Sequence, residues 1–117
     1  MVESLRPARI AGKTFRLTWT AGPKNSVTHE HIFHIDGSVS YAQIESNRPA
    51  QYTTAKQYGA FEVAPDCFIV SYLDNSGYAL SVVLNFKDHR MHGFATTNTQ
   101  WYPVQGRFEE LSMASAS

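Results

Sequence analysis

Three observations in the sequence predict an all-β fold, and more narrowly a single eight-stranded antiparallel up-and-down β-barrel. Residues 67–97 form three runs rich in β-branched and aromatic side chains, joined by two short turns, which is the pattern of a β-meander. Similar runs recur roughly every 8–12 residues in the rest of the chain, and no segment has a convincing helical period. Short turns from each run to the next favour a barrel over a sandwich.

The positions of the strands follow from the alternation of apolar and polar residues and from the turn residues between the runs. Asp36-Gly37 is the clearest hairpin signal, and Pro103 confines the last strand to a sheet edge or a strand start. Segments 1–11 and 112–117 are expected to be loose tails. The expected strands are 13–20, 27–35, 38–45, 51–63 (broken near Gly59), 67–73, 78–86, 90–97 and 102–111.

Length and charge exclude several classes of protein. A chain of 117 residues is the size of one domain, so we expect a single domain over 1–117. Ten basic and ten acidic side chains, with no run of like charge, argue against nucleic acid or a membrane surface as a partner. No apolar stretch approaches the roughly 20 residues of a membrane span, and 1–11 lack the apolar core of a signal peptide, so a cytoplasmic location is expected.

The single Cys67 is expected to be a small core residue.

Four stretches of the chain resemble the molybdenum-cofactor-biosynthesis protein F family, which is grouped with the lipocalin-like (calycin) barrels. They are GKTFRLTWTAG at 12–22, HEHIFHIDG at 29–37, VSYLDNSGYALSVVLNF at 70–86 and HGFATTNTQWYPVQGRFE at 92–109. The resemblance covers nearly all of the chain after residue 11 and implies a calycin-like barrel. The shared motifs are typical of strands and turns and include no catalytic motif, so the resemblance implies a fold more than a function.

A more distant likeness is to the phenolic acid decarboxylases, which are also calycin barrels and need no cofactor. Those enzymes use two tyrosines on the first strand, an arginine on the third and a glutamate on the fourth. The corresponding positions in this chain hold Leu17, Trp19, Ala42 and Gln57, and none of the four matches. The likeness therefore implies a related pocket, lined at these positions, without the decarboxylase chemistry.

The most polar part of the sequence is 28–34, where His29 and His31 share one face of the expected strand while Glu30 and His34 share the other. Two histidines at i and i+2 can bind a metal, but a site needs three or four ligands. His92 or Glu62 could supply a third, although nothing in the spacing requires it. We therefore predict no metal and no cofactor. His29 is expected to line the pocket, and His31 is either a general base or an exposed rim residue. A one-residue slip of the strand would exchange its two faces.

One function that the sequence leaves open is binding of a small, largely apolar or aromatic molecule inside the barrel. Seven Phe, six Tyr and two Trp are enough to line such a cavity. Trp19, Tyr41 and Tyr72 are the best candidates to stack on the molecule. Trp101 is expected at the rim, where it would cover the open end.

The alternative function is that of a cofactor-independent lyase, isomerase or cyclase in the same pocket. In that case His31 or His92 would move a proton and Tyr72 would stabilise a developing oxyanion. A homodimer formed through an exposed strand edge or apolar patch is compatible with either function.

Overall fold

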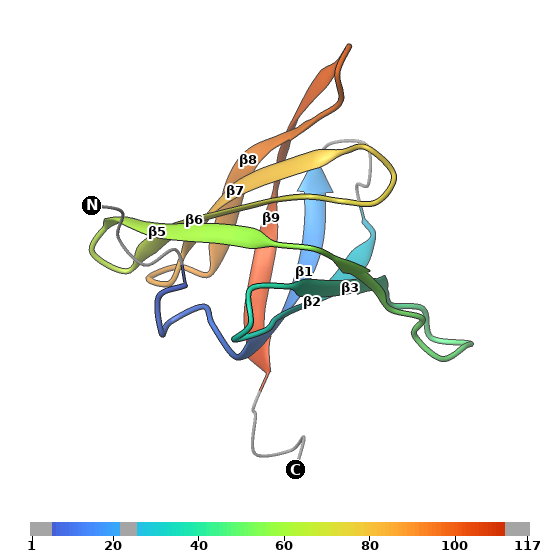
Figure 1. The fold of residues 1–117 in the computed structure, drawn as a ribbon, viewed down its shortest axis with the longest axis horizontal. Coiled ribbons are helices and arrows are strands. Elements are labelled where there is room, and N and C mark those ends of the chain that lie inside the picture. The colour runs from blue at the N-terminus through green and yellow to red at the C-terminus, as the bar shows by residue number, and fades with distance from the viewer. Residues whose placement is uncertain (1–5, 22–25, 112–117) are drawn as a thin grey trace.

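The protein is an antiparallel β-barrel that is nearly closed, as the computed structural model shows for residues 6–21 and 26–111 (Figure 1). The prediction of an all-β barrel is confirmed, with nine strands among the described residues where eight were expected. No helix within these residues is long and apolar enough to cross a membrane. The strands are β1 (Lys13–Ala21), β2 (Thr28–Phe33), β3 (Val39–Gln43), β4 (Thr53–Ala55), β5 (Tyr58–Ala64), β6 (Cys67–Leu73), β7 (Ala79–Asn85), β8 (Arg90–Thr96) and β9 (Trp101–Leu111).

The extra strand arises because the segment expected as one strand at 51–63 is divided. Its first part, β4, pairs with β3 and its second part, β5, pairs with β6, at the two ends of a single sheet ordered β4-β3-β2-β1-β9-β8-β7-β6-β5. The break lies at Lys56-Gln57 and not near Gly59, which pairs with Ser71 inside β5. These two residues carry the chain from one end of the sheet to the other.

Contacts from turns and side chains close the barrel where β4 and β5 do not pair. The Tyr58 backbone N–H donates to the Gly37 carbonyl at 2.9 Å. The Asn75 side chain donates to the Thr54 carbonyl at 3.2 Å, and its backbone N–H donates to the Tyr41 hydroxyl at 3.1 Å. The hairpin between β6 and β7 is therefore hydrogen-bonded to β3 and β4, at the opposite end of the sheet order.

One end of the barrel is filled by phenylalanine side chains. Phe15 makes edge-to-face contacts with Phe33, Phe86 and Phe108, with ring centroids 5.8 to 5.9 Å apart. Ile10 is fully buried in the same core. Large buried side chains thus pack against one another at this end.

Residues 6–11 pack onto that filled end, in contrast to the loose segment expected for 1–11. The backbone N–H groups of Ile10 and Ala11 both donate to the Pro7 carbonyl, which makes a compact turn. The Arg9 guanidinium lies 4.2 Å from the centroid of the Phe86 ring. No periodic pattern marks this turn in the sequence, because it buries a single apolar residue. Segments 1–5 and 112–117 lie outside the described residues.

The register of β2 decides which polar residues face the interior. His31 is directly opposite Phe15 of β1 and Tyr41 of β3, and it is buried. Glu30 is on the outer face, where it accepts hydrogen bonds from the Tyr52 hydroxyl and from Arg16. The strand therefore has His29 and His31 on its inward face. The sequence alone could not establish which of the two faces of this strand points inward.

Candidate functional site: a pocket at the open end of the barrel

The end of the barrel opposite the phenylalanine cluster contains a cavity of about 300 Å³. Small inward residues on three strands leave this space. Ala21 on β1, Ala95 on β8 and Val104 on β9 line it, whereas the same strands carry the larger Phe15, Met91 and Phe108 toward the other end. A cavity of this size can hold one small organic molecule. Its lining is Trp19, Ala21, His29, His31, Tyr41, Tyr72, Asp74, Ser76, Tyr78, Leu80, Ala95 and Val104.

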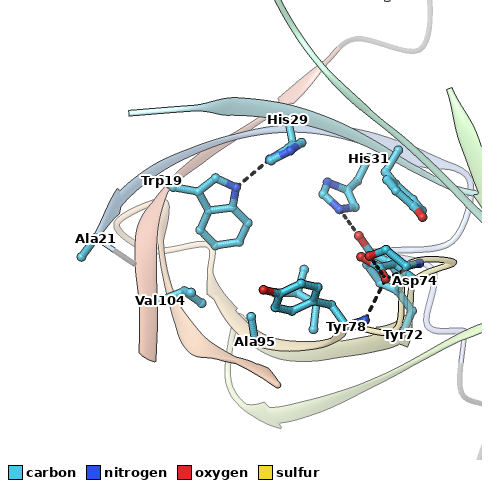
Figure 2. Close-up of a pocket in the computed structure, with 12 residues that line it drawn as sticks. Trp19, Ala21, His29, His31, Tyr72, Asp74, Tyr78, Ala95 and Val104 are labelled. Atoms are coloured by element: carbon cyan, nitrogen blue, oxygen red, sulfur yellow. Dashed lines mark hydrogen bonds between the residues drawn. The ribbon is translucent and has the colours of Figure 1, made fainter. Parts of the chain in front are cut away.

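The lining has an apolar side and a polar side. Figure 2 shows the Trp19 ring, Ala95 and Val104 on one side of the pocket and His31, Tyr72 and Asp74 on the other. The apolar side comes from β1, β8 and β9, and the polar side from β2, β6 and the turn after β6. A molecule with an apolar body and one polar end fits this division.

The centre of the polar side is a hydrogen bond between His31 and Tyr72. The His31 Nε2 atom and the Tyr72 hydroxyl oxygen are 2.5 Å apart, and both residues are buried. Burial, assisted by the neighbouring His29, lowers the pKa of His31 to about 3. Burial also raises the pKa of Tyr72, with smaller contributions from Tyr41 and Asp74. Both groups are therefore neutral at pH 7.

The hydrogen on the His31 ring can be assigned by counting donors. If the Tyr72 hydroxyl donates to Nε2, the ring hydrogen is on Nδ1, and that Nδ1–H is the one group of the pair without a partner among the described residues. If Nε2–H donates instead, Nδ1 and the tyrosine hydrogen both lack partners. The first arrangement leaves fewer buried groups unsatisfied, so Nδ1–H is a buried donor without a partner among the described residues.

Three further hydrogen bonds hold lining residues of the pocket in place. The Trp19 indole N–H donates to His29 Nδ1 at 2.8 Å, which orients both rings. In the turn after β6, Asp74 Oδ1 accepts hydrogen bonds from the backbone N–H groups of Ser76 and Tyr78, each at 2.9 Å. Gly77 permits this tight turn because its φ is +99°.

The sequence matches the family model of the MoaF N-terminal domain over residues 5–100. The chain belongs to this family. The resemblance inferred from the strand and turn motifs is thus confirmed. No curated protein matches the sequence significantly.

Among solved structures, the chain is similar to a protein from Burkholderia vietnamiensis whose crystal structure is described as that of "a putative beta-lactamase". The TM-score is 0.71 and the identity 18%, with 91% of this chain and 98% of that chain covered. At this identity the likeness bears on the fold alone. It supports the barrel of this MoaF-family chain independently of sequence.

Some of the residues singled out from the sequence lie together in this pocket. They come from β1, β2, β3 and β6, which are brought together by the curvature of the sheet. His31 is inside the barrel and not at an exposed rim position. The five that line the cavity are Trp19, His29, His31, Tyr41 and Tyr72.

The other singled-out residues lie elsewhere in the MoaF-family barrel. His92 is exposed on the outer face of β8, in a shallow apolar groove, so it cannot meet Tyr72. Leu17 is buried in the core without lining the pocket, and Ala42 is buried opposite Glu30 on the outer face. Gln57 is exposed in the link between β4 and β5. Trp101 is 64% exposed and packs on Phe94, away from the cavity.

The pocket also contains residues that the sequence reasoning missed, chiefly Asp74, Ser76 and Tyr78. They belong to a turn that was identified only as a connection between two strands. An available signal was the run Asp74–Gly77, because a turn that joins two barrel strands must lie at one of the two openings. Within the described residues no group of three or more His, Cys, Asp or Glu side chains could hold a metal ion.

Proposed function

We propose that this MoaF-family barrel binds one small organic molecule, largely apolar or aromatic, in the pocket between Trp19 and Tyr72. The observation that carries the proposal is the contrast between the two ends of the barrel. One end is packed with phenylalanine, while the other keeps a cavity of about 300 Å³ that has an apolar side and a hydrogen-bonding side. The apolar side would cover the body of the molecule, and the hydrogen-bonding side would hold a polar group on it.

Catalysis of a proton transfer in the same pocket is the second candidate, favoured by the short contact between His31 and Tyr72. The pKa of His31, about 3, weighs against it. Protonating this imidazole at pH 7 costs about 5 kcal/mol, since each pKa unit corresponds to about 1.4 kcal/mol. A general base works best when its pKa is near the working pH. A neutral hydrogen-bonding role therefore suits His31 better than proton transfer.

The two tryptophans of the chain can report binding, because Trp19 lines the pocket and Trp101 is exposed outside it. In a ¹H–¹⁵N spectrum, titration with the neutral probe 2-phenylethanol should shift the indole N–H signal of Trp19 and leave that of Trp101 in place. Equal shifts of both signals would refute binding in this pocket, and so would the absence of any shift with this probe and with its ammonium and carboxylate analogues.

A pair of matched substitutions tests the location further. Ala95→Phe fills the cavity and should abolish the Trp19 shift. Ala79→Phe makes the same change on the other face of the same hairpin, since side chains alternate along β7 and Leu80 is the one that lines the pocket. The Ala79 variant should still bind, and loss of binding in both would argue for a general disturbance of the hairpin.

A further inference from the structure

Building on the ligand-binding function proposed above, we propose that the pocket selects an organic cation, such as a small amine or quaternary ammonium compound with an aromatic or aliphatic body. The positive group lies beside Asp74 and among the tyrosine rings of the polar side. The apolar body extends toward Trp19 and Val104.

Asp74 sets the sign of the charge in the pocket. Its side chain is the one carboxylate among the described residues of the lining, and no lysine or arginine lines the pocket within that part of the chain. Its Oδ1 accepts hydrogen bonds from Ser76 and Tyr78, whereas Oδ2 accepts none from the described residues. The turn thus holds the carboxylate in place and leaves one oxygen for a ligand.

Aromatic rings make up much of the remaining lining. Tyr41 and Tyr72 lie with ring centroids 5.6 Å apart, and Tyr78 and Trp19 complete the aromatic part of the lining. The faces of Trp and Tyr rings attract cations through their quadrupoles, which is how aromatic cages recognise ammonium groups. An anion would find the opposite potential at these rings.

His31 does not reverse this preference. His31 is neutral at pH 7 because burial lowers its pKa to about 3, so it offers a dipole and no positive charge. The charge of Asp74 is also felt inside the pocket, since it contributes to the raised pKa of the Tyr72 phenol. The charge of Asp74 favours a positive ligand over a negative one, and a neutral His31 adds no positive charge that would oppose it.

A series of three compounds that share a phenyl ring and a two-carbon linker tests the inference. They are 2-phenylethylammonium, 2-phenylethanol and 3-phenylpropanoate, each titrated into the labelled full-length protein while the Trp19 indole signal is followed. We expect the ammonium compound to bind roughly tenfold more tightly than the alcohol, and the carboxylate more weakly than both.

Asp74→Asn removes the charge while its amide oxygen can still accept the hydrogen bonds of the turn. This variant should lower the preference for the ammonium compound over the alcohol to about twofold or less. Asp36→Asn is the matched control, because Asp36 Oδ1 makes the same type of turn with Ser38 and does not line the pocket. The Asp36 variant should keep the full preference.

The outcomes separate this inference from the proposed function. If the alcohol binds as tightly as the ammonium compound, or the carboxylate binds best, cation selection is refuted while the binding function stands. Cation selection by Asp74 is likewise refuted if Asp74→Asn keeps the full preference. If none of the three compounds shifts the Trp19 signal, the inference and the proposed function are both refuted.

Discussion

Acid should destabilise this barrel through the buried histidine of the pocket. In the unfolded chain the pKa of a histidine is about 6.5, whereas burial lowers the pKa of His31 to about 3 in the fold. Below pH 6.5 the unfolded chain takes up a proton that the folded protein does not. Stability is therefore fully present above pH 6.5 and is lost as the pH falls toward 3.

The size of the effect follows from the same pKa difference. Each pH unit in this window removes about 1.4 kcal/mol, so His31 should lower the free energy of unfolding by about 3 kcal/mol between pH 6.5 and pH 4. Other groups titrate in the same range, so the quantity to measure is a difference between the wild type and His31→Phe. Urea unfolding at pH 7, 6, 5 and 4 gives it.

The expected result is that the wild type loses its advantage over the variant as the pH falls, by about 3 kcal/mol in total. His92→Gln at the exposed outer position controls for the loss of a histidine in general. A difference between the wild type and His31→Phe that stays constant within about 0.5 kcal/mol would refute the reasoning. If the Phe variant does not fold, the ring signals of His31 in the wild type serve instead, and a titration near pH 6.5 would contradict the prediction.

Three further substitutions test the packing and the pocket. Ile10→Ala should cost about 2–5 kcal/mol by urea unfolding because Ile10 is fully buried, whereas Ile35→Ala at a position 77% exposed should cost little; equal costs would mean that residues 6–11 do not pack on the barrel. Gly93→Ala places a Cβ 1.9 Å from the Ser81 carbonyl oxygen, so we expect a loss of about 3 kcal/mol or no folded protein, and a stable variant would contradict the close approach of β7 and β8. Tyr72→Phe leaves His31 without its partner and should cost about 1–3 kcal/mol, while the double variant with His31→Phe should cost less than the sum of the two singles; additive costs would show that the pair is not coupled.

The strands were predictable because the alternation of residues and the turn residues that mark them lie within each segment of the sequence. The bounds of β6 agree with the expected 67–73, where alternating bulky residues are followed at once by four turn residues. Strand β2 is shorter than the expected 27–35, because the His34 N–H donates to the Ser38 carbonyl and begins the turn. Alternation alone cannot show where a hairpin turn starts when the turn itself contains an apolar residue such as Ile35.

The site was only partly predictable because it is made by contacts between distant strands. His31 and Tyr72 are 41 positions apart in the sequence. Their meeting depends on the face that β2 turns inward, which a slip of one residue would reverse. The sequence identified both residues as candidates, yet the pairing itself required the register of the whole sheet.

His92, the other histidine considered as a partner of Tyr72, lies outside the pocket for a different reason. On β8 the inward positions are Met91, Gly93 and Ala95, whereas the outward ones are His92 and Phe94. In the second half of this strand the inward residues, Gly93 and Ala95, are small, whereas the large Phe94 faces outward. Gly93 is required inside because β7 approaches too closely for any side chain, so backbone geometry overrides the alternation of apolar residues.

The same preference for small inward residues explains why the pocket exists at this end. Strands β1, β2, β7 and β9 all run through both ends of the barrel, so the backbone alone does not create the cavity. What changes along each strand is the volume of the inward residue, from Phe108 to Val104 on β9 and from Phe86 to Leu80 near β7. The cavity is therefore specified by side-chain size, and a single larger residue at Ala95 should be enough to remove it without changing the fold.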